Sequence, residues 1–226
     1  LPELMNVGPL AEQRLDEQTS LSGSTWLGWG GPEGDFTSNS RGLASEWPAS
    51  GPPVVWSRAL GQGHSSIIVD GDRLYTMYRP PATFPDEWAD EEIIIALDAS
   101  SGETVWEYRF RSSLETMNFS YGAGPHATPL VVDDRLFAAS TDKQLFALEK
   151  NTGRELWSVN LVEEFGAPPN QMRFAVMPGY APSPLAYKDT VIVMVGGENQ
   201  GVIAFSQETG EVKWVGGHFP DSITPA

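Results

Sequence analysis

Residues 96–106 read ALDASSGETVW, and the chain repeats this pattern twice more. The second copy, at 147–157, reads ALEKNTGRELW, and the third, at 204–214, reads AFSQETGEVKW. Each copy has Ala first, Gly seventh and Trp eleventh. An apolar strand, a turn whose Gly can take a positive φ, and a second strand with Trp at a fixed offset indicate a short β-hairpin. A hairpin that recurs in this way predicts a chain built from repeated small sheets.

The repeat extends beyond the hairpin to two further apolar segments in each unit. Asp72, Asp134 and Asp189 occupy the same turn of the three copies, with short apolar segments before and after it. Four short strands with meander spacing predict one antiparallel sheet per unit, and such units stack into a β-propeller. The predicted blades cover about 65–110, 127–161 and 182–217, and a next blade starts at 222–226.

Three blades do not close a propeller ring. The segment 54–60 carries Trp56 and is predicted to be the last strand of a blade whose other strands are missing. We therefore expect an all-β fold of four-stranded antiparallel blades, about three of them present, as part of a seven- or eight-bladed ring. Two explanations stay open. The chain is a fragment of a longer protein, or it forms a homodimer that completes the ring.

Residues 1–52 are predicted to form an N-terminal extension, and the blades to occupy 53–226. The stretch from Trp26 to Pro48 is rich in Gly, Ser and Trp without a periodicity. Because indole rings are costly to leave in water, we expect Trp26, Trp29 and Trp47 to anchor an ordered coil.

Composition excludes several classes of protein. The 226 residues carry a net charge of −16, which repels a nucleic-acid backbone. There are no cysteines, so disulfides, thiolate metal sites and Cys nucleophiles are excluded. No run of 18 apolar residues predicts a membrane span. The chain starts at Leu1 without a basic-apolar leader, as expected of a processed protein.

The three hairpins resemble the tryptophan-docking motif A-x-D-x-x-T-G-x-x-x-W of the pyrroloquinoline-quinone-like propeller repeats. The first copy matches at Ala96, Asp98, Gly102 and Trp106, with Ser101 in place of Thr. In the second copy Glu replaces the motif Asp, and in the third copy Ser does. A W-x-x-W-x-G-P stretch before the repeats, at residues 26–32, resembles a bacterial exported branch of that family.

The resemblance implies a fold more firmly than a function. The family includes quinoprotein alcohol and sugar dehydrogenases, in which pyrroloquinoline quinone (PQQ) lies over the propeller axis near a Ca²⁺ ion and a catalytic Asp. It also includes propeller-type lipoproteins of outer-membrane assembly. Many of the dehydrogenases carry a disulfide of adjacent cysteines against the quinone, which this chain cannot form. The resemblance implies a periplasmic or extracellular protein.

Two histidines occupy the same position in adjacent blades. His64 precedes the first strand of one blade and His126 that of the next, and Tyr180 lies just before the third. First-strand ends meet around the central channel of a propeller, so the imidazoles could converge there as acid–base groups or metal ligands. The alternative is that they line a wet channel and hydrogen-bond to the backbone.

The long loops between blades are the other candidate site. Residues 111–126 and 161–181 exceed what a meander needs, and long loops on rigid repeats often bind ligands. We expect ligand contacts from aromatic and cationic residues of these loops, namely Tyr121, Arg173, Phe174 and Tyr180. The alternative is that they pack against the adjacent sheet.

The sequence thus predicts a non-catalytic exported scaffold whose loops around the channel bind a protein or glycan partner. No catalytic or metal-binding residue is assigned. The alternative function is a quinoprotein dehydrogenase, which would need PQQ and Ca²⁺.

Overall fold

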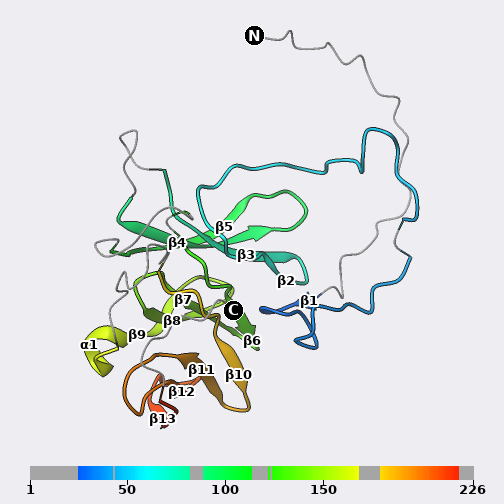
Figure 1. Ribbon diagram of the computed structural model, residues 1–226. Coiled ribbons are helices and arrows are strands. Elements are labelled where there is room, and N and C mark those ends of the chain that lie inside the picture. Colours follow the sequence, from blue (N-terminus) through cyan, green and yellow to red (C-terminus); the bar gives the residue numbers. More distant parts are fainter. Residues whose placement is uncertain are drawn as a thin grey trace.

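The computed structural model describes residues 25–42, 44–81, 89–113, 122, 124–167 and 179–218. They form three antiparallel sheets that succeed one another along the chain and stack side by side (Figure 1). The predicted start of a further blade at 222–226 lies outside the described residues. Within the described residues, no helix has the length and apolar character needed to cross a membrane.

Each sheet is a meander in which neighbouring strands pair in sequence order. Blade 1 contains β2 (Ile68–Asp70), β3 (Arg73–Tyr78), β4 (Glu91–Asp98) and β5 (Thr104–Arg111). Blade 2 contains β6 (Leu130–Val132), β7 (Arg135–Ala139), β8 (Gln144–Glu149) and β9 (Glu155–Asn160). Blade 3 contains β10 (Leu185–Tyr187), β11 (Thr190–Met194), β12 (Val202–Ser206) and β13 (Val212–Gly216). The predicted all-β fold of stacked antiparallel sheets is confirmed, with four strands in blades 2 and 3 and a fifth strand added to blade 1.

The repeated hairpin has the same geometry in all three blades. Its Gly, at φ +72°, +72° and +73°, donates its N–H to the carbonyl four residues earlier, at 2.8, 2.9 and 3.0 Å. A β-bulge follows the first Ala of each copy, and that Ala pairs with the Trp ten residues later. The extra residue at the bulge sets the offset of the Trp, so each indole leaves its sheet in the same direction.

Two of the three hairpin tryptophans bind the hairpin of the following blade. Trp106 Nε1 donates to Lys150 O at 2.8 Å, and Trp157 Nε1 donates to Gln207 O at 3.1 Å. The indoles lie over Gly153 and Gly210, where a Cβ would come within 2.5 and 2.8 Å of the ring. Glycine is therefore required at this position for two reasons: the backbone has a positive φ, and the indole approaches too closely for a Cβ.

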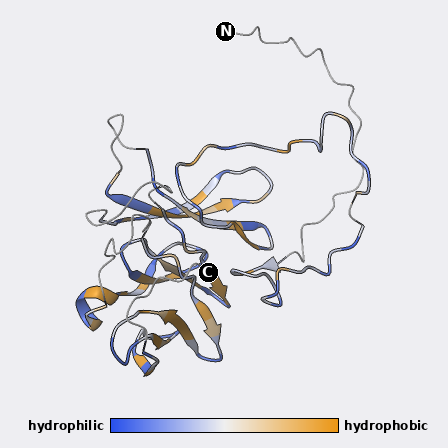
Figure 2. Ribbon diagram, in the orientation of Figure 1, coloured by the Kyte–Doolittle hydropathy of each residue, from blue (hydrophilic) through white to orange (hydrophobic). Residues whose placement is uncertain are grey.

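Two apolar clusters hold the three sheets together. The first joins blade 1 and blade 2 and contains Tyr75, Ile94 and Phe146; the second joins blade 2 and blade 3 and contains Phe137 and Phe205. Figure 2 shows the apolar residues concentrated in the strands, with hydrophilic residues in the turns between them. Burial of this surface between sheets is the main stabilising contribution, because no four-stranded sheet covers its own faces.

The segment before blade 1 differs from its prediction. Residues 54–60 form no strand, yet Trp56 binds blade 1 as the other tryptophans bind their neighbours: its Nε1 donates to Ala99 O at 2.9 Å. Trp56 and Leu60 pack against a buried cluster that includes Ile93 and Ile95. A coil therefore makes this contact in place of the predicted strand.

The extension predicted for residues 1–52 contributes a strand to blade 1. The two-residue strand β1 (Thr25–Trp26) pairs antiparallel with β2, and Leu27 O accepts from Val131 N of blade 2 at 2.7 Å. Of the three tryptophans predicted to anchor this stretch, Trp26 packs against the cluster between blades 1 and 2. Trp29 is 43% exposed and contacts Phe36 of the same coil. The prediction was wrong for Trp47, which is 64% exposed.

A single turn of helix, α1 (Leu161–Phe165), follows the last strand of blade 2 and was not predicted. Asn160 caps it by accepting from the N–H groups of Val162 and Glu163, both at 3.1 Å. Leu161 is fully buried and belongs to the cluster between blades 2 and 3. The helix therefore attaches the beginning of the long loop of 161–181 to the apolar core.

Candidate functional site

The candidate site lies at the end of the sheets where each first strand begins. Because the strands are antiparallel, the end of β3 and the start of β4 lie at this same end, which the structure shows by the bridge between Gln62 and Arg79. The loop of 111–126 also starts and ends here, after β5 and before β6. We call this side of the stack the loop end.

His64 and His126 meet at the loop end. Their rings stack at a centroid distance of 4.8 Å and an interplanar angle of 11°. His64 N donates to Pro125 O at 2.8 Å, which ties the segment before β2 to the segment before β6. The predicted convergence of these two side chains across adjacent blades is thus present, while their role in binding stays a prediction.

A cavity of about 370 Å³ lies beside His64 and is lined by Gly61, Gln62, Gly63, His64 and Gly122. Its wall is mostly backbone. A Cβ on Gly122, at φ +89°, would come within 3.0 Å of the His64 ring, and a Cβ on Gly61 would come within 2.2 Å of Arg79 O. Glycine at these positions lets the backbone approach closely, so the cavity offers peptide groups and an imidazole to a ligand.

A buried ion pair lies at the same end of blade 1. Arg79 Nη2 donates to Glu92 Oε1 at 2.7 Å, and both side chains are fully buried. The guanidinium also donates to the carbonyls of Ala89 and Ser112, at 2.5 and 3.2 Å. These bonds connect the end of β3 to the segment that precedes β4 and to the segment that follows β5.

The second carboxylate oxygen of Glu92 reaches the neighbouring blade, where it accepts from Thr141 N at 3.2 Å. Burial raises the pKa of Glu92, and the charge of Arg79 and the bonds from Thr141 oppose that rise. A carboxylate in this position needs its partners, because a buried charge without them is strongly unfavourable. The network therefore connects blades 1 and 2 at the loop end.

Tyr180 is fully buried, and its environment is that of a packing residue. Its hydroxyl donates to Met194 O at 2.6 Å, and its N–H donates to Thr141 O at 2.9 Å. Burial raises its pKa far above the ordinary range. Tyr180 thus connects the same loop of blade 2 to blade 3, and its predicted contact with a ligand stays a prediction.

Three predicted binding residues, Tyr121, Arg173 and Phe174, lie outside the described residues. The sequence reasoning missed Arg79 and Glu92. A signal was available, since a charged residue directly follows the apolar run of β3 and another directly precedes the three isoleucines of β4. Charged residues beside buried strands indicate either a solvated strand end or a buried pair.

The chemistry that this site can perform is chiefly hydrogen bonding and stacking. Among the described residues, no group of three or more His, Cys, Asp or Glu could hold a metal ion. The two imidazoles can donate, accept and stack.

The chain is similar in sequence to part of two quinone alcohol dehydrogenase subunits. It is 27% identical over 166 residues to the dehydrogenase subunit of the quinone alcohol dehydrogenase of Acetobacter aceti, and 26% identical over 158 residues to that of Komagataeibacter europaeus. Each match covers 68% of this chain and 19% of the relative, so the chain spans about a fifth of the length of these relatives.

Solved structures with a similar fold include a europium-containing methanol dehydrogenase and BamB from Moraxella catarrhalis. The first is 21% identical, with a TM-score of 0.49, and covers 72% of this chain and 26% of its own. The second is 18% identical, with a TM-score of 0.33, and covers 71% of this chain and 50% of its own.

A family of PQQ-like repeat proteins, described as outer membrane protein assembly factor BamB, matches residues 89–220, which include most of the three blades. This chain belongs to that family.

Proposed function

We propose that this chain is part of an exported, non-catalytic propeller scaffold, which binds a protein or glycan partner at its loop end. The observation that carries the proposal is the glycine-walled cavity beside the stacked His64 and His126. Backbone amides and carbonyls at close range bind peptide or sugar groups by hydrogen bonds. The family description, an assembly factor, supports a binding role and a location in the periplasm or outside the cell.

The test places a photo-crosslinking amino acid at the exposed Gln62, which lines the cavity, in the full-length protein inside its own cells. We expect an adduct of defined mass, which disappears when His64 and His126 are both replaced by Ala. The matched control carries the crosslinker at the exposed Arg154, on the hairpin of blade 2. If Gln62 gives no adduct beyond that of Arg154, the scaffold proposal is wrong.

A second candidate function, a quinoprotein alcohol dehydrogenase, is favoured by the 27% identity to the Acetobacter aceti subunit. It is tested by adding PQQ and Ca²⁺ to the full-length protein and measuring the quinone absorbance band and dye-linked alcohol oxidation. Turnover that depends on both additions would replace the scaffold proposal with the catalytic one.

A further inference from the structure

A second cavity lies at the opposite end of blade 1 from the histidines. β1 pairs with the last residues of β2, Thr25 with Asp70 and Trp26 with Val69, next to the turn into β3. The coil that follows β1 then folds back over this strand end. Together they line an open pocket of about 620 Å³, which is within the size range of small-molecule sites. Its lining residues are Thr25, Trp26, Pro32, Glu33, Thr37, Ser38, Asn39, Ser40, Arg41 and Val69.

The coil is held in place at its base. Backbone bonds from Gly31 N to Gly28 O and from Phe36 N to Gly30 O close two turns, at 3.2 and 2.7 Å. Phe36 packs edge-on against Trp29 with 5.2 Å between ring centroids. Gly28 in turn lies so close to Leu130 of blade 2 that a Cβ would come within 2.8 Å of it. The pocket wall is thus attached to the stacked sheets.

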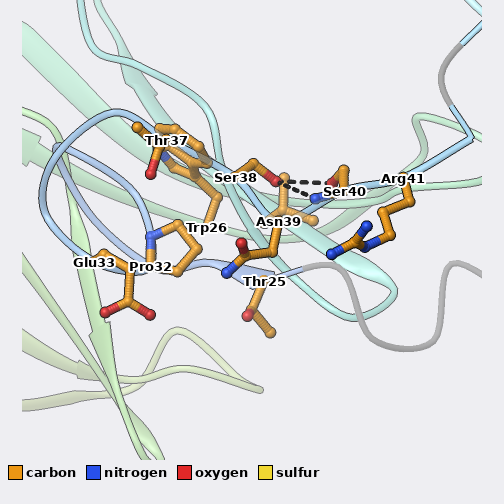
Figure 3. A pocket seen from close by; sticks show the side chains of 10 residues that line it. Thr25, Trp26, Pro32, Glu33, Thr37, Ser38, Asn39, Ser40 and Arg41 are labelled. Atoms are coloured by element: carbon orange, nitrogen blue, oxygen red, sulfur yellow. Dashed lines mark hydrogen bonds between the residues drawn. The ribbon is translucent and has the colours of Figure 1, made fainter.

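Local hydrogen bonds also fix the hydroxyl groups of the lining. Thr37 donates to Asp35 Oδ1 from both its N–H and its hydroxyl, at 2.9 and 2.7 Å. The hydroxyls of Ser38 and Ser40 lie 2.8 Å apart, and Ser40 N donates to Ser38 Oγ at 3.2 Å (Figure 3). A ligand would therefore meet hydroxyl groups whose positions are already set, which lowers the entropy cost of binding.

Three other polar side chains of the lining remain available to a ligand. Within the described part of the chain, the side chains of Glu33, Asn39 and Arg41 make no hydrogen bond or ion pair. In Figure 3 the Asn39 amide and the Arg41 guanidinium extend toward the centre of the view. One side chain accepts, one donates, and the amide does both.

This lining fits a neutral saccharide better than other small ligands. Sugar hydroxyls both donate and accept, as the pocket does, and the apolar face of a sugar ring suits the ring of Pro32. A phosphate or other dianion would meet a single guanidinium and be repelled by Glu33. A largely apolar ligand would leave the hydroxyls and charges of the wall unpaired.

We propose that the pocket between β1 and the coil of residues 32–41 binds a neutral oligosaccharide, with Asn39 and Arg41 as the chief hydrogen-bonding groups. This site is separate from the loop end and does not depend on the function proposed for it. A propeller with both sites would bind one partner at each end of its sheets.

The test titrates the full-length protein with maltotriose, cellotriose and N,N′-diacetylchitobiose and follows binding by calorimetry and tryptophan fluorescence. Digalacturonic acid and inorganic phosphate serve as the anionic probes. We expect at least one neutral probe to saturate below about 10 mM, and Asn39→Ala and Arg41→Ala each to weaken it about tenfold. Arg154→Ala, an exposed arginine elsewhere, should leave the affinity unchanged.

Each contrary result overturns the proposal. The proposal is wrong if no neutral probe saturates or if only the anions bind. It is also wrong if both pocket variants bind the neutral probe as tightly as the wild type does. Because Asn39 and Arg41 are exposed, their replacement should not unfold the chain, and an unchanged melting temperature verifies this. Failure here leaves the loop-end scaffold standing, and loss of the crosslink at Gln62 leaves this pocket standing.

Discussion

The two outer faces of the stack differ. On blade 1, Trp56 and Leu60 of the preceding coil cover the face opposite to blade 2. On blade 3, the corresponding outer face has no described segment over it, and Leu185 and Trp214 are 63% and 45% exposed. Their counterparts in blade 1, Ile68 and Trp106, are 0% and 8% exposed because blade 2 covers them.

The comparison shows that residue type alone does not make a core. The outer face of blade 3 carries Leu185, Ala204 and Trp214. The equivalent positions of blade 1 carry Ile68, Ala96 and Trp106, so the exposed face of blade 3 has the same residue types as a buried one. Only the neighbouring sheet converts such a face into a stabilising contact. Stability in this chain should therefore depend on position in the stack.

The largest expected effect separates two equivalent tryptophans. Trp106→Ala should lower the free energy of unfolding by about 3–5 kcal/mol, because it empties a buried site and removes the bond to Lys150 O. Trp214→Ala should cost less than about 1 kcal/mol, because that indole is half exposed. Urea denaturation of both variants measures the difference. Equal losses would mean that the outer face of blade 3 is covered in solution.

The next effect concerns the buried ion pair at the interface between blades 1 and 2. Arg79→Ala should destabilise the chain by about 3 kcal/mol, because it leaves the Glu92 carboxylate buried without its partner. The double variant Arg79→Met, Glu92→Leu should recover much of the loss, since it removes both charges. Arg154→Ala is the exposed control. A double variant as unstable as the single one would show that the pair itself, and not the unpaired charge, matters.

A smaller effect is expected at the first strands, where hydroxyls connect the blades. Ser66 N donates to Thr128 Oγ1 at 3.2 Å, and Thr128 N donates to Ser183 Oγ at 2.9 Å. Thr128→Val keeps the shape but removes the acceptor, which should cost about 1 kcal/mol in thermal or urea unfolding. Thr128→Ser retains the hydroxyl and should stay near wild type. If the two variants lose the same stability, packing of the methyl group explains the position.

The smallest effect distinguishes the hairpins of blades 1 and 3. Hydrogen bonds from Ser100 and Ser101 lower the pKa of Asp98 to about 2. The folded pKa lies below the unfolded one, so Asp98 stabilises the fold above pH 4 and loses this contribution as the pH falls from about 4 to 2. Asp98→Ser, which copies Ser206 of blade 3, should flatten the fall of the melting temperature over that window. An unchanged slope would exclude this carboxylate as its source.

The fold was predictable to the extent that it repeats. The Gly and Trp of each hairpin and the Asp of each turn define the strands, because a structural unit that recurs must solve the same packing problem each time. The strand β1 was not predictable. Thr25 and Trp26 have no periodicity, and they are extended only because the edge of β2 offers them partners.

The candidate site was predictable only in part. The alignment of repeats placed His64 and His126 at equivalent positions, and stacking of the rings follows from that equivalence. The partnership of Arg79 with Glu92 could not be inferred, because a loop separates them and either charge could have been solvated. The glycine-walled cavity could not be predicted either, because its wall forms only where backbone segments far apart in the sequence approach one another.

The tryptophan contacts have a direction. Trp56, Trp106 and Trp157 each reach forward, to the hairpin of the unit that follows in sequence, and none reaches back. An additional copy of the unit inserted between two neighbours would therefore recreate a matching contact on both of its sides. Gene duplication could therefore lengthen such a stack by whole units without a new kind of interface between neighbours.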